Sequence, residues 1–226
     1  MRKLAVLAKR IEACRACPRL VRYRELVART KRRAYREWTY HGRPVAGFGD
    51  ARARIVIVGL APGAHGANRT GRAFTGDRSG DFLFAALHRA GIASQKTSTA
   101  RDDGLRLDGA FVTLAVRCAP PKNLPTRAEI RRCAHWLDDE LALLPSERVF
   151  LALGAIAFDA VVAHARRAGV AVARSRFAHG AEVDLGGAGT LLASYHVSQQ
   201  NTQTGRLTPA MFDAILRRAK SLAQYK

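Results

Sequence analysis

This chain of 226 residues lacks the features that mark several common classes of protein. No apolar run approaches the roughly 18–20 residues that a membrane-spanning helix needs. The basic N-terminus is followed by further charged residues, without the apolar core of a signal peptide. These absences argue against a membrane protein and a secreted precursor, and they predict an intracellular, cytoplasmic protein.

Acidic residues are scarce. Asp and Glu number 18 against 38 Lys and Arg, which gives a formal net charge of +20. Such an excess favours a polyanionic partner, most simply nucleic acid, because basic side chains displace the counterions of its phosphates. A GC-rich genome would also enrich arginine, alanine and glycine, but it would not explain so few acids. The charge therefore places nucleic acid first among the partners.

Cysteine is limited to four positions, Cys14, Cys17, Cys118 and Cys133. An intracellular chain of this length argues against two disulfides. Cys14 and Cys17 form a C-x-x-C, the spacing that places two thiolates on one metal. The second C-x-x-C of a zinc ribbon is absent, and wide spacing is commoner where a cluster bridges distant segments. Spacing alone does not distinguish among three interpretations: a zinc site, a [4Fe–4S] cluster and four unrelated buried cysteines.

Strand and helix patterns alternate along the chain, and no internal repeat interrupts them. Compact apolar runs of β-branched and aromatic residues predict strands, whereas capping signals and helical periodicity predict the helices between them. This order is typical of an α/β fold with a mostly parallel sheet covered on both faces. The predicted strands are 55–60, 111–116, 149–153 and 190–195, and the predicted helices are 4–12, 20–34, 79–91, one from 126, one from 154 and one from 208. Residues 94–108 are polar and predict a surface excursion.

A glycine-rich loop (residues 59–81) follows the first predicted strand. It carries six glycines and three arginines, and it lacks both the Gly-Lys-Ser/Thr of a Walker loop and the G-x-G-x-x-G of a dinucleotide fold. A long loop in a compact domain is usually functional or disordered. Because the loop leads directly into a helical pattern after Ser79, we interpret it as a ligand site at the carboxyl end of a strand. A surface loop without function is the simpler alternative.

A second polar segment, the histidine loop (residues 195–208), follows the last predicted strand and precedes a capped helix. It begins Tyr195-His196 and continues with mostly polar residues to Thr208. Isolated histidines are more often structural than catalytic. His196 lies at the same predicted sheet edge as the glycine-rich loop, however, and this shared position favours a catalytic role.

The two loops and the four cysteines together resemble the uracil-DNA glycosylase superfamily. The motifs are GLAPGAHGANRTGR-AFTGD from Gly59 and H-x-S-x-x-N-x-x-TGRLT from His196, and the resemblance extends from Cys14 through the last helix. The chain is most similar to family 5, the iron–sulfur group of prokaryotic type. Family 4 shares the cysteine layout but starts its first motif with Gly-Glu-Gly-Pro-Gly. One departure is Val197, where relatives usually have proline.

The resemblance implies a three-layer α/β/α fold with a central, mostly parallel sheet. It implies one domain over residues 1–226, with an N-terminal helical segment of about residues 1–40 that binds the cluster. The implied cofactor is a structural [4Fe–4S] cluster on the four cysteines. The implied activity is base flipping and excision of uracil, and of other deaminated bases such as hypoxanthine, from double-stranded DNA, with single-stranded DNA as a second substrate, by a monomer.

The resemblance and the residue chemistry also assign individual roles. His196 would donate a hydrogen bond to the uracil oxygen, and Asp77 would orient water, with Asp81 as its rival. Asp81 falls within a first helical turn, where an acid simply stabilises the helix dipole. Asn123 would read a base edge, although a proline-flanked turn is its simpler reading. The remaining expected contacts are Gly59, Ala61, Pro62, Gly63 and Phe74 for the base, Ser198, Gln199, Gln200 and Asn201 as a wedge in the duplex, and Arg69 and Arg206 for phosphates.

Two other functions stay open. A zinc-bearing nucleic-acid-binding module would explain the charge and the C-x-x-C, but not two elaborate loops. A homologue that traps uracil-DNA without multiple turnover would be compatible with a diverged histidine loop.

Overall fold

The computed structural model describes residues 2–146 and 148–224. Its centre is a six-stranded sheet in the order β1-β3-β2-β4-β6-β5. The four inner strands pair in parallel, and the two edge strands, β1 and β5, run antiparallel to their neighbours. The strands are β1 Phe48–Gly49, β2 Ile55–Gly59, β3 Ala110–Leu114, β4 Val149–Leu153, β5 Glu182–Asp184 and β6 Thr190–Ser194.

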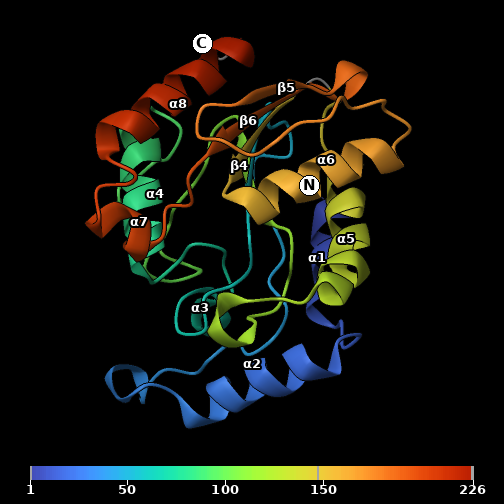
Figure 1. The fold of residues 1–226 in the computed structure, drawn as a ribbon. Coiled ribbons are helices and arrows are strands. Elements are labelled where there is room, and N and C mark those ends of the chain that lie inside the picture. The colour runs from blue at the N-terminus through green and yellow to red at the C-terminus, as the bar shows by residue number, and fades with distance from the viewer. Residues whose placement is uncertain (1, 147, 225–226) are drawn as a thin grey trace.

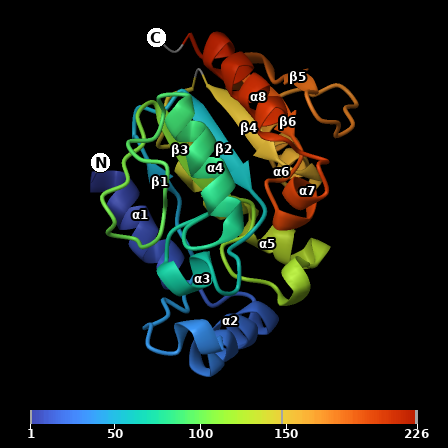
Figure 2. The same cartoon turned by 90° about the vertical axis from the view of Figure 1, so that its left-hand side faces the viewer.

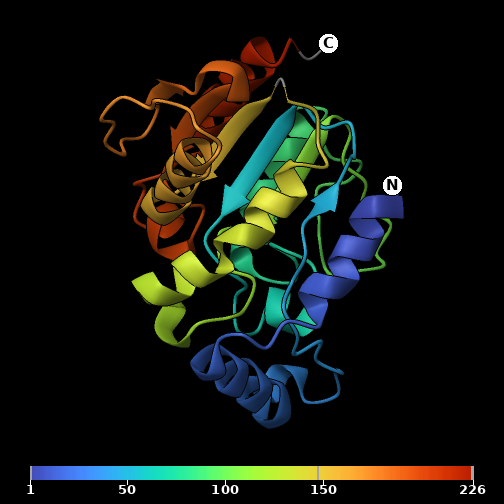
Figure 3. The ribbon, with the colours of Figure 1, turned by 90° about the vertical axis from the view of Figure 1, so that its right-hand side faces the viewer.

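Helices cover both faces of the sheet, which makes the three layers expected from the sequence (Figures 2 and 3). Ile55 and Ile57 of β2 pack toward α4 and α8, whereas Val56 and Val58 of the same strand pack toward α5 and α6. A strand alternates its side chains between faces, so a run that is apolar at every position is buried on both. The helices are α1 Arg2–Glu12, α2 Pro18–Thr30, α3 Ala67–Thr70, α4 Arg78–Arg89, α5 Arg127–Leu141, α6 Ala155–Arg167, α7 Gln199–Gln203 and α8 Pro209–Leu222, with 3-10 turns η1 Arg33–Tyr35, η2 Pro121–Asn123 and η3 Gly186–Ala188.

The predicted inner strands and main helices are confirmed with small shifts of their ends. The start of α4 differs from the prediction: Asp77, not Ser79, is the N-cap, and its carboxylate accepts from the Gly80 N–H. Thr126 and Glu129 form the expected capping box at the start of α5. The predicted helix 20–34 ends at Thr30, where Lys31 has a positive φ of 52°. No helix in the described residues is long and apolar enough to cross a membrane.

Residues 94–108 form a mostly exposed loop, as their polarity predicts, but three of its side chains are buried. Leu105 and Leu107 pack in the core beside α4, and Ser98 is fully buried. Ala93 and Leu107 form an isolated antiparallel bridge. Ser98 and Asp103 also bind Arg72, so the exposed loop is anchored to the glycine-rich loop.

Candidate active site

Both loops leave the same edge of the sheet, because β2 and β6 run parallel to the intervening β4. At the end of β4, Gly154 has a φ of +92°, and a Cβ there would lie 3.2 Å from the His196 Cβ. The glycine thus lets the histidine loop pass close over β4. The end of β2 and the histidine loop are therefore brought together, as the sequence predicts.

Phe74 is the point at which the two loops meet. Its ring centroid lies 6.2 Å from that of His196, with 36° between the ring planes. A Cβ on Gly59 would lie 2.5 Å from the Phe74 ring, so the ring occupies the space left at the end of β2. Phe74 also has a φ of 53°, a conformation that is uncommon for a bulky residue and is concentrated at functional sites. The fold holds this ring in place at a cost in backbone strain.

The Asp77 carboxylate is enclosed by two glycines of the same loop. A Cβ on Gly63 would lie 2.9 Å from Asp77 Oδ2, and one on Gly66 would lie 1.9 Å from it. Burial raises the pKa of Asp77 above its usual value, opposed by hydrogen bonds from the Gly80 and Ser79 backbone N–H groups. Asp81 is different: its side chain is 55% exposed, with Arg78 at 4.0 Å. The structure therefore separates the two rival carboxylates by their surroundings.

His196 is held as a neutral imidazole at neutral pH. Burial lowers its pKa to about 4, because a charged ring would lose its hydration. The backbone carbonyl of His196 accepts a hydrogen bond of 2.8 Å from the Asn201 side chain. Asn201 thus fixes the histidine instead of extending into solvent, and Val197, where relatives usually have proline, packs fully buried in the core.

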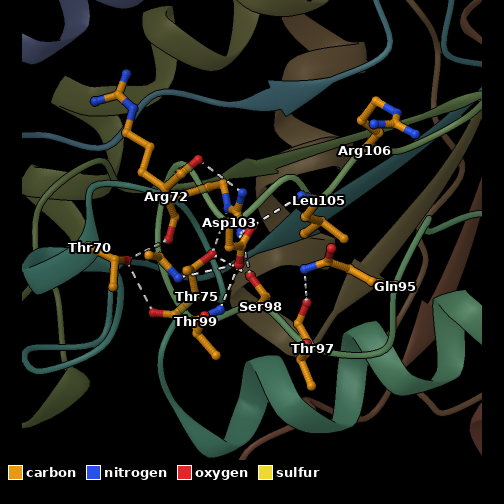
Figure 4. A network of polar contacts seen from close by, with 12 residues as sticks. Thr70, Arg72, Thr75, Gln95, Thr97, Ser98, Thr99, Asp103, Leu105 and Arg106 are labelled. Carbon is orange, nitrogen blue, oxygen red and sulfur yellow. Dashed lines mark hydrogen bonds and ion pairs between the residues drawn. The ribbon is translucent and has the colours of Figure 1, made fainter.

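Arg72 anchors the glycine-rich loop to residues 98–103 (Figure 4). Its guanidinium binds the Asp103 carboxylate at 2.8 Å, Ser98 Oγ at 2.8 Å and Thr75 Oγ1 at 3.0 Å. The Gly76 N–H donates to the Ser98 carbonyl at 2.8 Å. Burial alone would raise the pKa of Asp103, but hydrogen bonds from Arg72 and from backbone N–H groups hold it below its usual range. Sequence reasoning missed this network, since the ion pair joins residues 31 positions apart.

Arg69 does not lie where a phosphate contact would place it. Only 3% of the residue is exposed, and its guanidinium lies between the rings of Tyr35 and Trp38, at 4.0 and 4.1 Å from their centroids. It donates to the carbonyls of His65 and Gly76, both at 2.8 Å. Its Nη1 is buried without a partner in the described residues. The side chain is enclosed by aromatic rings and loop carbonyls, so it orders the loop and does not face solvent.

The other expected residues are spread around the edge of the site. Gln199 and Gln200 are exposed on α7, which Ser198 precedes as N-cap. Arg206 is exposed and lies 4.7 Å over the Tyr195 ring. Asn123 is exposed, with a φ of 58°, on the turn after β3. Pro62 is buried, and Ala61 packs beside Cys118, on the side of the cysteines.

The four cysteines are free thiols that line one small cavity between the N-terminal segment, α5 and the end of β3. Arg24, which is 2% exposed, donates to Cys118 Sγ at 3.1 Å, and the Arg117 N–H donates to Cys133 Sγ at 3.3 Å. Burial raises the pKa of Cys118 to about 12 and that of Cys133 to about 11. Among the described residues, no three His, Cys, Asp or Glu side chains are grouped as one bound metal ion requires.

The arrangement suits chemistry on a flat ring that leaves as an anion. The Phe74 ring offers a stacking face, the neutral His196 imidazole offers an N–H donor, and Asp77 brings a carboxylate. A donor placed where negative charge develops stabilises the transition state more than the ground state. The fold is α/β/α, and the loops after β2 and β6 define a candidate enzyme site at one edge of its sheet.

The family model described as "Uracil DNA glycosylase superfamily" matches residues 46–220. The chain belongs to this superfamily. It is 57% identical to the type-5 uracil-DNA glycosylase of Thermus thermophilus, over 94% of this chain and 95% of the relative. It is 53% identical to the type-5 enzyme of Mycobacterium bovis, over 94% of this chain and 79% of that protein. The type-5 enzyme of Pyrobaculum aerophilum is 46% identical, over 93% of this chain and 89% of its own length.

Proposed function

We propose that the protein is a uracil-DNA glycosylase of base excision repair. It extrudes uracil from DNA and hydrolyses the N-glycosidic bond between the base and deoxyribose C1′. The observation that carries this proposal is the neutral His196 beside the Phe74 ring, at the sheet edge where both loops meet. The type-5 relatives are named for this activity.

Bond cleavage moves an electron pair onto uracil and leaves a cationic, oxocarbenium-like sugar. Phe74 stacks on the extruded ring, and the His196 N–H donates to the uracil oxygen on which negative charge develops. A neutral imidazole donates its N–H hydrogen bond and keeps the proton, so it stabilises the uracil anion without protonating it.

Asp77 faces the sugar cation and orients the attacking water. The water oxygen bonds to C1′ while its proton passes to the departing base or to solvent. The burial that raises the pKa of Asp77 also makes its carboxylate a stronger base and strengthens its attraction to the cation. Asn123 supplies a further contact to the base edge, and Ser198, Gln199 and Gln200 lie at the N-terminal end of α7, where they enter the duplex beside the extruded nucleotide.

The test is single-turnover excision on a uracil duplex, scored by free uracil and by cleavage of the abasic site. His196→Ala should reduce the rate by ~10²–10³, the usual effect of losing one oxyanion donor. Asp77→Asn should also impair excision while DNA binding persists. Asp81→Asn, at the exposed neighbour, is the matched control and should leave the rate near that of the unaltered protein. Loss of excision in Asp81→Asn with normal excision in Asp77→Asn would contradict the assignment.

The same assay separates this proposal from its competitors. Binding of uracil-DNA without release of free uracil would favour a trapping homologue. The range of substrates is measured with duplexes that carry hypoxanthine in place of uracil and with single-stranded DNA. We expect excision of hypoxanthine, and faster excision from duplex than from single-stranded DNA. DNA repair takes place inside the cell, so we expect the protein to be cytoplasmic. We also expect it to be a monomer.

The cysteine cavity fits a [4Fe–4S] cluster, which we propose as the cofactor. Four thiols around one cavity match the ligand set, and the buried Arg24 and the Arg117 N–H match the hydrogen-bond donors that thiolate-bound clusters use. When bound, the cluster would tie the N-terminal segment of about residues 1–40 to the sheet, with no redox step in excision. Anaerobically purified protein should be brown and should contain about four iron and about four sulfide ions per chain. Stoichiometric zinc without iron would reject the cluster.

A further inference from the structure

A dense group of cations lies immediately after α2. Arg32, Arg33 and Arg36 are exposed there. Together with the flanking Arg29 and Lys31 they form what we term the basic segment, residues 29–38. None of its cations forms an ion pair with a carboxylate among the described residues. Like charges this close repel one another, so the segment gains free energy from a polyanion.

An aromatic clamp holds the basic segment in a fixed position. Tyr35 and Trp38 enclose the Arg69 guanidinium from two sides, at 4.0 and 4.1 Å, and their rings meet edge to face with centroids 6.5 Å apart. Cation–π contacts of this kind are strongest where the cation is removed from water, and the Arg69 residue is only 3% exposed. Trp38 nevertheless stays 39% exposed, which is unusual for a tryptophan that already packs on a cation.

The clamp links the basic segment to the active site. Arg69 donates to the Gly76 carbonyl at 2.8 Å, and Gly76 directly precedes Asp77. In Figures 1 and 2 the end of α2 lies below α3, at the end of the molecule toward which the inner strands point. Arg69 therefore fixes the position of the basic segment relative to the Asp77 carboxylate.

We propose that the basic segment is a second DNA-contacting surface, which binds the phosphates of the duplex flanking the excised nucleotide. This inference rests on the proposed function, because it assumes DNA as the substrate. The exposed guanidinium groups bind phosphate oxygens, and Trp38 packs against the sugar–phosphate backbone. Because phosphate contacts do not depend on the base sequence, this surface positions the duplex relative to the active site without selecting a sequence.

The test is the salt dependence of binding to an undamaged duplex. Each phosphate contact contributes about 0.9 to the slope of log K against log [salt]. The combined variant Arg32→Ala, Arg33→Ala, Arg36→Ala should therefore reduce the slope by roughly 1–3 and weaken binding at least tenfold at low salt. Its single-turnover excision rate at saturating protein should stay within about twofold of normal, because no reacting group has changed.

The matched control removes the same charge from the opposite end of the molecule. Arg166, Arg174 and Arg176 are exposed, and they lie on α6 and on the connection to β5, far from α2 in Figures 1 and 3. Their combined alanine variant should keep the slope close to that of the unaltered protein. Equal slopes for the two triple variants would overturn the proposal, since only total charge would then matter.

Trp38 provides an independent readout. Trp136 is 8% exposed, so acrylamide should quench mainly Trp38 in the free protein. Duplex should reduce this quenching, and Trp38→Phe should remove the effect. Quenching that duplex leaves unchanged would contradict a contact at this segment. Excision by the unaltered protein is measured separately, so a failed proposed function and a failed surface are distinguishable.

Discussion

Asp103 offers the sharpest test of how the active site is held. Its side chain is 10% exposed, and that of its partner Arg72 is 6% exposed. Asp103→Asn keeps the size of the side chain and one accepting oxygen, but it leaves the Arg72 cation buried without a counter-charge. The perturbation is therefore electrostatic and falls on the anchor of the glycine-rich loop.

The expected loss of stability is large. Removing one partner of a buried ion pair typically costs about 3–5 kcal/mol. For a protein of this length, about 2–4 °C of Tm is lost per kcal/mol, so the Tm should fall by roughly 6–20 °C. The pKa of Asp103 is lowered in the folded state, so its contribution is present above the unfolded pKa of about 3.9 and is lost as pH falls through the folded pKa. The difference between the proteins should therefore be complete at pH 7 and shrink in acid.

The matched control is Asp102→Asn, because Asp102 is the exposed neighbour. It removes the same charge and should change the Tm by less than about 2 °C, as most exposed substitutions do. Below its Tm, Asp103→Asn should also excise uracil at least ~10-fold more slowly, since small displacements of positioned groups cost that much or more. Equal melting temperatures for the two variants would refute the anchoring role of the pair.

The other predictions concern the site itself. Gly66→Ala should reduce excision by ~10² because its Cβ would lie 1.9 Å from Asp77 Oδ2, whereas Gly187→Ala, with no atom within 4 Å of its Cβ, should not affect the excision rate. The folded-state pKa of His196 is lowered to about 4, so the protein should lose stability as pH falls from about 6.5 to about 4, and Tm against pH should be flatter in His196→Gln. If Tm changed with pH in the same way in the unaltered protein and in His196→Gln, His196 would not be buried in its neutral form. Arg206→Ala should weaken binding to all duplexes alike and leave the saturated excision rate unchanged; a large fall in that rate would place Arg206 in the chemistry.

The inner sheet could be predicted because parallel strands buried on both faces are apolar at every position. Ile55–Gly59 and Val149–Leu153 show this pattern, and both are strands. The edge strands Phe48–Gly49 and Glu182–Asp184 are two and three residues long, with no run for a pattern to detect. Their existence depends on a neighbouring strand, which is a tertiary property.

The loops could be located from the sequence, but the direction of their side chains could not. Arg69 and Arg72 both appear as cations among glycines, the composition of an anion site, yet both are buried. Their partners explain the difference: Tyr35 and Trp38 enclose Arg69, and Asp103 pairs with Arg72. In both cases the covering groups lie outside the loop, so the composition of the loop does not reveal that the arginine is buried.

The same reasoning explains why the basic segment is the better place to seek phosphate contacts. Once Arg69 and Arg72 are committed to holding the glycine-rich loop, their charge is unavailable to bind DNA. The net charge of +20 then attracts DNA through cations that form no ion pair or ring contact within the described residues. Arg32, Arg33 and Arg36 meet that condition, and the buried Arg69 is the group that fixes their distance from Asp77. The buried Arg69 and Arg72 thus set the geometry of the site, whereas the exposed arginines of the basic segment supply the attraction.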